Sequence, residues 1–256
     1  MVGDRPETML RESARQRRLP GVPVPEVCLL DPDGDITRLL RRQGRGRAHP
    51  GWACFHTCMT EFREEGRDLG VVSCAVGAPF SVLVAEQLFA SGCQLLISVS
   101  SSGKLAPWLR PRDFILIDEA LRDEGTSYHY LPPADYSQAP AALLRELVGA
   151  FHGLPVRVHQ GTSWTTDAPF RETPLAISAM QAREILAVEM EAAALYAFAE
   201  ACSRPVLCFA QITNQMGQAQ GDFEKGEANG ALDALMVILQ TAERLLGRRY
   251  DFASTA

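Results

Sequence analysis

Short apolar runs of strand length recur along the chain, and helical patterns separate most of them. The apolar runs cover residues 27–30, 71–76, 95–99, 114–117, 156–160 and 206–212. Their hydrophobicity is nearly continuous, which is typical of strands that are buried on both faces. The helical patterns cover residues 81–90, 139–151, 177–186, 191–202 and 228–246. This alternation predicts a largely parallel sheet between layers of helices.

We therefore predict an α/β fold, a single-domain three-layer α/β/α sandwich with a twisted mixed, mostly parallel central sheet over residues 26–250. Residues 1–25 are polar and arginine-rich, and the repeated prolines at their end favour extended chain, so they are predicted to form an N-terminal arm. Glycine-rich, charged stretches at 44–49 and 217–226 are predicted to be surface loops. Ligands of such sheets bind where strands end and helices begin.

The net charge of the chain argues against nucleic acid as a partner. The 256 residues carry a formal net charge of -6, whereas binding to a nucleic-acid backbone needs a surplus of Lys and Arg. Basic clusters at 11–18 and 38–47 are interpreted as solvated faces. The N-terminus has no apolar segment like that of a signal peptide, and no apolar run reaches membrane-spanning length. We expect a cytoplasmic protein with neither nucleic acid nor membrane as partner.

The cysteines agree with that location. There are 7 of them, an odd number without paired spacing, which is typical of reduced thiols in a cytosolic protein. Cys54 and Cys58 flank His56, but no second Cys/His pair follows at ligand spacing, so we predict no metal site.

The most informative chemistry lies at residues 187–199, where Glu189 and Glu191 precede an apolar, alanine-rich helix. Burying two carboxylates costs several kcal/mol unless each finds donors or a ligand. The start of a helix supplies unpaired N–H groups and a positive dipole end, which are expected to keep a carboxylate ionised near neutral pH. An ionised carboxylate only accepts hydrogen bonds, so a suitable ligand is a pair of neighbouring hydroxyls, as on a ribose. The alternative is one capping acid beside one solvated residue.

Residues 188–193 resemble the ribose-binding segment of the nucleoside phosphorylase family, which includes uridine phosphorylase, hexameric bacterial purine nucleoside phosphorylase and the methylthioadenosine nucleosidases. Four further segments resemble the family in the same order: a glycine-rich turn at 76–81, an anion-binding loop at 98–105, and the stretches 125–130 and 165–172. The likeness spans roughly residues 25–247 and is nearest to uridine phosphorylase. Five motifs in register are specific where one would be weak.

For the ribose, the resemblance implies that Glu191 binds the hydroxyl pair, that Met190 packs against the sugar or base, and that Glu189 lies close by. Neighbours at i and i+2 of a helix point to different faces, so only one glutamate is expected to make the main contact. For the base, the resemblance implies Ser102, Gly103 and Phe170, with Thr166 and Asp167 supporting the turn. Phe170 has the alternative of being a core aromatic.

Asn214 stands where the purine phosphorylases of the family carry an aspartic acid that protonates the base. An amide donates a hydrogen bond but no proton, which suits a pyrimidine or 6-oxopurine. The alternative is an ordinary turn asparagine. Arg171 and Gln181 are candidates, by residue type, for reading uracil.

The nucleophile site departs from the family. Relatives that use phosphate hold it with a Gly-Asp-Pro-x-Arg turn and an arginine before the anion-binding loop. Here residues 30–35 read Leu-Asp-Pro-Asp-Gly-Asp and Ser98 stands at the second place, so both arginines are missing. The remaining candidates for phosphate are Gly77, Ser100, Ser101 and His56, the last near the place where a neighbouring subunit's arginine reaches in among relatives. Arg42, Arg45 or Arg47 are further substitutes.

The same departure favours an alternative. The nucleosidases of the family lack those arginines and place an acid after the first strand to activate water. By register this acid is Asp35, with Asp33 as the near alternative, and a carboxylate is a suitable general base. The residues are equally typical of a surface turn.

These observations predict a nucleoside phosphorylase that cleaves the N-glycosidic bond of a pyrimidine or 6-oxopurine ribonucleoside, giving free base and ribose 1-phosphate. Asn214 would act on the base, and no cofactor is expected beyond phosphate as co-substrate. One alternative is a nucleosidase that uses water activated by Asp35, and another is a non-catalytic nucleoside-binding relative. The resemblance also implies a homo-oligomer, a dimer or a hexamer.

Overall fold

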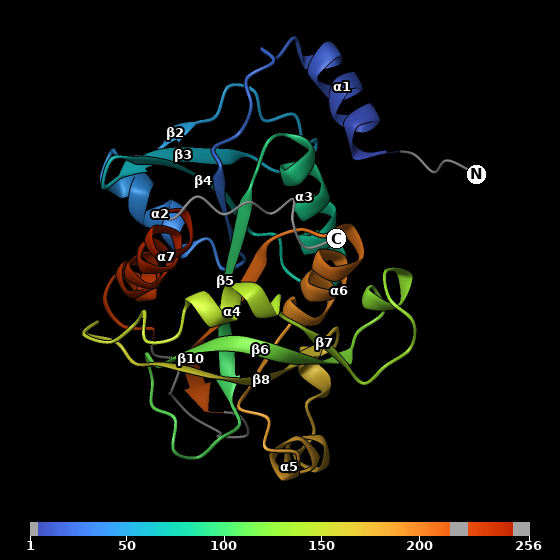
Figure 1. Ribbon diagram of the computed structural model, residues 1–256, viewed down its shortest axis with the longest axis vertical. Coiled ribbons are helices and arrows are strands. Elements are labelled where there is room, and N and C mark those ends of the chain that lie inside the picture. The colour runs from blue at the N-terminus through green and yellow to red at the C-terminus, as the bar shows by residue number, and fades with distance from the viewer. Residues whose placement is uncertain (1–4, 216–224, 248–256) are drawn as a thin grey trace.

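The computed structural model describes residues 5–215 and 225–247 (Figure 1). Its α-helices are α1 Pro6–Arg17, α2 Asp35–Arg42, α3 Ala78–Ala90, α4 Ala141–Glu146, α5 Pro174–Ala182, α6 Ala192–Cys202 and α7 Ala231–Leu246. Short 3-10 helices are η1 Ser127–His129, η2 Pro169–Arg171 and η3 Glu227–Gly230. The strands are β1 Val27–Asp31, β2 Arg47–Ala48, β3 Met59–Glu64, β4 Arg67–Ser73, β5 Leu95–Lys104, β6 Phe114–Asp123, β7 Tyr136–Gln138, β8 Val158–Thr166, β9 Ala187–Glu189 and β10 Val206–Gln215.

Within these described residues the strands form one 10-stranded mixed sheet. Parallel pairing joins β4 to β1, β1 to β5, β5 to β10, β6 to β8, and β8 to β9. Antiparallel pairing joins β2 to β3, β3 to β4, β5 to β9, β6 to β7, and β6 to β10. The predicted α/β fold with a mixed central sheet is confirmed.

Five strands of this sheet close on themselves, which the hydrophobic pattern did not predict. β10 pairs with both β5 and β6, β6 pairs with β8, and β9 joins β8 back to β5. Register shifts in β10 after Ile212 and in β6 after Ile117 accompany the curvature, as bulges do in closed sheets. The closure brings the ends of β5, β8 and β9 together.

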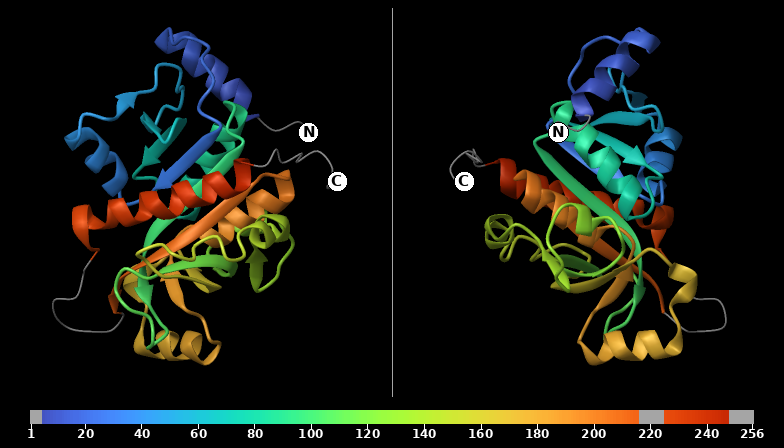
Figure 2. Two further views of the ribbon diagram at one scale, coloured as in Figure 1. Left: turned by 60° about the vertical axis from the view of Figure 1, so that its left-hand side comes forward. Right: turned by 90° about the vertical axis from the view of Figure 1, so that its right-hand side faces the viewer.

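Helices cover the sheet on two sides (Figures 1 and 2). α3 and α6 pack on one face, with Leu88 and Leu195 in the core on that side. α2 and α7 pack on the other face, with Leu40 and Ile238 in its core. Strand β5 contributes to both cores, which explains its continuous hydrophobicity.

The predicted N-terminal arm contains a helix that we did not predict. Residues 6–17 form α1, which lies beside α3, and only the proline-rich stretch after it lacks regular structure (Figure 1). The buried hydroxyl of Ser13 donates to the carbonyl oxygen of Ala53, and Nη1 of Arg17 donates to that of Cys54 at 2.9 Å. Pro6 at the first helical position is the start signal that could have revealed this helix.

The basic cluster at 38–47 contains most of α2, which we also did not predict. Ile36, Leu39 and Leu40 are buried, whereas Arg41 and Arg42 are exposed, so the cluster is the solvated side of an amphipathic helix.

No helix in the described part of the chain has both the length and the apolar character needed to cross a membrane. All seven cysteines carry free thiols.

Candidate functional site

Glu189 ends β9 and is 3% exposed, and both of its carboxylate oxygens are fully engaged within the chain. Its Oε1 accepts from the hydroxyls of Ser163 at 3.1 Å and Thr165 at 2.5 Å, both on β8. Its Oε2 accepts from the backbone N–H groups of Glu191 and Ala192, each at 2.7 Å. Glu189 therefore satisfies the N–H groups at the start of α6 and ties that helix to β8.

Glu191 is 2% exposed and has fewer donors. Its Oε1 accepts from the backbone N–H of Gly77 at 2.7 Å, in the turn between β4 and α3. Its Oε2 accepts from the hydroxyl of Ser100 on β5 at 2.8 Å. Two segments distant in sequence thus hold this carboxylate at the junction of strand ends and helix starts, where folds of this class bind ligands. Met190, between the two glutamates, is half-buried.

Burial and the neighbouring charge of Glu189 together raise the pKa of Glu191 to about 7, against the lowering effect of the donors Gly77 and Ser100. Burial also raises the pKa of Glu189, while its hydroxyl and N–H donors lower it. We expected the start of the helix to keep a carboxylate ionised near neutral pH. Desolvation outweighs that effect at Glu191, because the side chain is almost completely enclosed.

The residues expected at the base lie around the same strand ends. Gly103 on β5 pairs with Val188 of β9 and with Asn214 of β10. Ser102 is buried, and its hydroxyl donates to the carbonyl oxygen of Ser100 at 3.3 Å. The side chain of Asn214 lies outside the described residues, as do residues 217–224 of the loop predicted at 217–226.

The turn after β8 has the supporting contacts that were expected of it. Asp167 accepts from the N–H of Gly125 at 3.0 Å, and the hydroxyl of Thr166 accepts from the N–H of Ala168 at 3.2 Å. Phe170 in η2 is 100% exposed, so the alternative interpretation as a core aromatic is wrong. Gln181 donates to the carbonyl oxygen of Leu105 at 3.0 Å.

A pocket of about 830 Å³ lies between α1, α3 and the stretch 125–130. Its wall includes Met9, Pro79, Glu86, Thr126 and Tyr130. The hydroxyl of Tyr130 donates to Glu86 at 2.5 Å and ties one wall to α3. Because α1 was not predicted as a helix, its contribution to this pocket was also missed.

The acidic turn at 30–35 gives its three aspartates different surroundings. Asp31 caps α2, accepting from the N–H groups of Gly34 and Ile36 at 3.0 Å and of Thr37 at 3.2 Å. Burial raises its pKa to about 6 despite these donors. Asp33 accepts from the N–H of Ser101 at 3.0 Å.

Asp35 is paired with two cations. It accepts from Nη2 of Arg38 at 2.6 Å, from Nζ of Lys225 at 2.7 Å and from the amide of Asn229 at 3.2 Å. Burial alone would raise the pKa of Asp35, but the hydrogen bonds from Lys225 and Arg38 outweigh it and lower the pKa. Stabilisation of its charged form makes Asp35 a weak general base.

Lys225 belongs to this site, and we did not predict it from the sequence. Its ammonium also lies 3.3 Å from Asp33, so one cation links two of the three aspartates. The only signal was a lysine at the end of the glycine-rich stretch 217–226, 190 residues from Asp35.

The sequence matches the family model described as the phosphorylase superfamily over residues 27–243. The chain belongs to the phosphorylase superfamily. A uridine phosphorylase from Thermococcus kodakarensis is 30% identical over 251 residues, which cover 90% of this chain and 83% of that protein. A guanosine phosphorylase from Halorubrum lacusprofundi is 29% identical over 136 residues, covering 53% of this chain and 56% of that protein.

A solved structure of the superfamily has the same fold. The crystal structure of uridine phosphorylase from Vibrio fischeri, complexed with 6-hydroxy-1-naphthoic acid, matches with a TM-score of 0.71 at 18% identity, covering 91% of this chain and 94% of that chain. The resemblance inferred from the five motifs is confirmed, and the chain is an enzyme of the nucleoside phosphorylase type, a pentosyltransferase.

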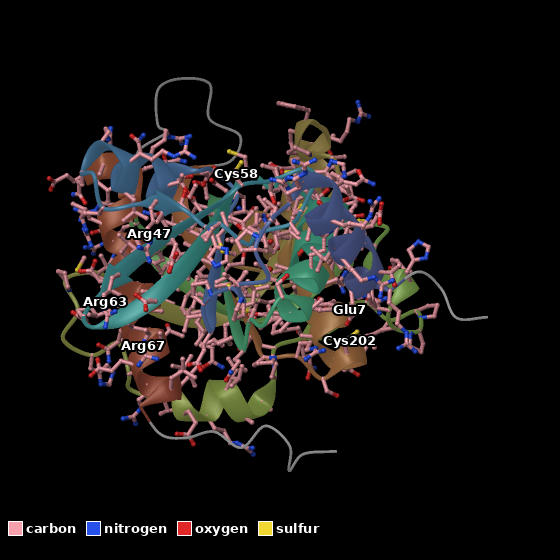
Figure 3. All side chains as sticks on the ribbon, turned by 90° about the horizontal axis from the view of Figure 1, so that it is seen from above. Glu7, Arg47, Cys58, Arg63, Arg67 and Cys202 are labelled. Carbon is pink, nitrogen blue, oxygen red and sulfur yellow. The ribbon has the colours of Figure 1, made fainter. Side chains whose placement is uncertain are left out.

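The other residues that were expected to bind phosphate have the following surroundings in the structure. The N–H of Gly77 is already bonded to Glu191. His56 is exposed, beside Phe55, which is 49% exposed. Arg45 pairs with Glu64 and Arg47 with Glu61, on the edge strands β2 and β3 or next to them. Figure 3 shows Arg47, Arg63 and Arg67 together on one side of the molecule. The two arginines at this edge are paired with its own acids, which gives them a partner other than phosphate.

We expect the affinity for a ribonucleoside to rise with pH across neutrality. Only the ionised form of Glu191 accepts from both ribose hydroxyls, and its pKa is raised to about 7. Well below that pKa, each pH unit should weaken binding by about tenfold. Calorimetric titration of uridine without phosphate, from pH 5.5 to 8.5, measures this. Dideoxyuridine, which lacks both hydroxyls, is the control, and a pH-independent affinity for uridine would contradict the assignment.

Proposed function

We propose that the protein cleaves the N-glycosidic bond of a ribonucleoside, with Glu191 accepting hydrogen bonds from the 2′ and 3′ hydroxyls of the ribose. The observation that carries this proposal is the buried carboxylate of Glu191, held by Gly77 and Ser100 where the ends of β5 and β9 meet two helix starts. Holding a buried carboxylate costs free energy that a ribose bound through two hydroxyls would offset. Glu189 positions the start of α6 and is proposed as the neighbour of the ribose subsite.

Phosphate is the proposed nucleophile. A phosphate oxygen would attack C1′, the C1′–N bond would break, and the base would leave with the bonding pair and take up a proton, giving ribose 1-phosphate. The names of the relatives, uridine phosphorylase and guanosine phosphorylase, support phosphorolysis. Ser101 is the proposed neutral donor next to the ribose subsite, since the hydroxyl of Ser100, the other expected donor, already donates to Glu191. No metal or organic cofactor is needed for this reaction.

For the base, we propose a pyrimidine first and a 6-oxopurine second. The backbone of Asn214 pairs with Gly103, the residue after Ser102 on β5. An amide can donate to a carbonyl oxygen or a purine N7. Phe170, exposed beside the turn of Thr166 and Asp167, is the proposed base contact. Uridine is therefore the first substrate to test.

Hydrolysis is the second candidate, and the acidic turn favours it. By the resemblance, Asp33 and Asp35 belong to the turn in which relatives that use phosphate carry an arginine, and a nearby carboxylate can activate water. Asp35 is firmly paired with Arg38 and Lys225, so we favour Asp33 for this role. Asp33 has the more exposed side chain, at 32% against 8%.

The proposed setting is nucleoside salvage in the cytoplasm by a homo-oligomer, a dimer or a hexamer. Seven free thiols support a reducing compartment. Exposed apolar side chains, with Phe170 at 100% and Leu175 at 82%, support contact with another copy.

The test is to incubate the protein with uridine, inosine, guanosine, adenosine and methylthioadenosine, each with and without phosphate. Chromatography then follows free base and sugar product. We expect cleavage of uridine that depends on phosphate and yields ribose 1-phosphate. Free ribose in phosphate-free buffer would instead establish hydrolysis. Thermal stabilisation by a nucleoside without any product would establish a binding protein and overturn catalysis.

A further inference from the structure

The carboxylate of Asp33 occupies a backbone donor next to the proposed ribose subsite. Its Oδ2 accepts from the N–H of Ser101 at 3.0 Å, and the adjacent residue, Ser100, holds Glu191 through its hydroxyl. Successive residues of β5 therefore engage two different carboxylates. The carboxylate that binds the N–H of Ser101 is that of Asp33, in the turn after β1 and 68 residues away in sequence.

The same carboxylate holds a cation. Nζ of Lys225 lies 3.3 Å from Asp33 and 2.7 Å from Asp35, and its side chain is only 11% exposed. An ammonium group held by two carboxylates has much of its charge neutralised, so its attraction for another anion is weakened.

A third group at this place is a hydroxyl without a partner. Oγ of Ser101 is buried and makes no hydrogen bond to any described residue. An oxyanion bound here would find the N–H and hydroxyl of Ser101 and the ammonium of Lys225 together. Asp33 already uses two of these three groups.

We propose that Asp33 is an internal competitor of phosphate that determines how well this site accepts the anion. Inorganic phosphate must displace the Asp33 carboxylate from the Ser101 N–H and from Lys225, because two anions sharing one position repel each other. Asp33 is suited to this exchange, since its side chain is 32% exposed whereas that of Asp35 is 8% exposed. The inference rests on the proposed function only in treating this position as that of the nucleophile.

The consequence is a specificity determinant for the nucleophile. In the resting protein the carboxylate keeps phosphate affinity low, so phosphorolysis responds to phosphate concentration over a high range. Removal of the Asp33 carboxylate would free the N–H of Ser101 beside its unbonded hydroxyl and leave Lys225 with Asp35 as the one remaining acid of the two, which favours binding of a dianion.

The test measures binding of inorganic phosphate by calorimetry to wild type, Asp33→Ala, Asp33→Asn and Asp35→Asn. Asp33→Ala removes both the charge and the acceptor, so its Kd for phosphate should fall by at least about tenfold. Asp33→Asn removes the charge, but its side-chain oxygen can still accept from the N–H of Ser101. Its gain in phosphate affinity should therefore be smaller. Asp35→Asn is the matched control, because it removes an equal charge from Lys225 and leaves Ser101 occupied. Its gain should be the smallest of the three.

Two results would overturn the proposal. One is unchanged phosphate affinity in both Asp33 variants. The other is an increase in phosphate affinity in Asp35→Asn equal to that in Asp33→Ala, which would show that only the net charge of the site matters. Thermal denaturation of each variant verifies that it is folded. The KM for phosphate in uridine cleavage should fall in the same order. If no nucleoside is cleaved, the proposed function fails, while the calorimetric ranking still decides the role of Asp33.

Discussion

Glu191→Gln is expected to reduce nucleoside cleavage severely and, at the same time, to stabilise the fold at pH 8. The glutamine keeps the size of the side chain and can still accept from Gly77 and contact Ser100. It cannot accept from both ribose hydroxyls as a charged group. Hydrogen bonds to charged groups contribute about 1.5–3 kcal/mol each, so the loss of two should lower kcat/KM by about 10²–10⁴-fold.

The gain in stability follows from the raised pKa. Folding raises the pKa of Glu191 from 4.5 to about 7, so between these values the folded state binds more protons than the unfolded state. Stability therefore falls as the pH rises through this window, and above pH 7 the full penalty of the buried charge is present. Removing the charge should increase the free energy of unfolding by about 3 kcal/mol at pH 8 and by much less at pH 5.

Urea denaturation of wild type and Glu191→Gln at pH 8 and pH 5, with uridine turnover measured alongside, checks both parts. A stability gain that is equal at the two pH values would exclude the buried charge as its cause. Turnover within tenfold of wild type would remove Glu191 from ribose recognition. A gain in stability together with a loss of activity is the signature of a residue retained for function.

The continuous hydrophobic runs located six strands, because burial on both faces is a local sequence property: β1, β4, β5, β6, β8 and β10. The short or less continuously apolar strands β2, β3, β7 and β9 were not predicted. The closure of β5, β8, β9, β6 and β10 was not predictable, since it depends on pairing of β10 with two strands and on register shifts within two of them. α2 was missed because the Asp-Pro-Asp-Gly turn before it is a loop signal. Its aspartate Asp31 is in fact the group that caps the helix.

In the candidate site, too, local features were predictable and contacts between distant segments were not. The sequence predicted that Glu189 and Glu191 precede a helix, because residue type and helical pattern are local. It could not assign their different surroundings, since the donors to Glu191 lie 91 and 114 residues away. It also could not place Lys225 against the acidic turn.

Glu189→Ala is expected to destabilise the fold by about 3–5 kcal/mol, the cost of removing one partner from a buried charged network. The N–H groups of Glu191 and Ala192 and the hydroxyls of Ser163 and Thr165 would all lose their acceptor. Buried donors without a partner cost more than the hydrogen bonds contributed, since water cannot replace the lost acceptor. Urea denaturation at pH 7.5 measures this loss.

Glu189→Gln is the matched control, because its carbonyl oxygen can face the two N–H groups while its amide donates to the two hydroxyls. We expect stability within about 1 kcal/mol of wild type and retained uridine binding, in contrast to Glu191→Gln. The charge of Glu189 contributes to the raised pKa of Glu191, so the pH profile of uridine binding should also shift to lower pH. Equal loss of uridine binding in the two glutamine variants would show that both carboxylates contact the ribose, and an unshifted profile would show that the two groups titrate independently.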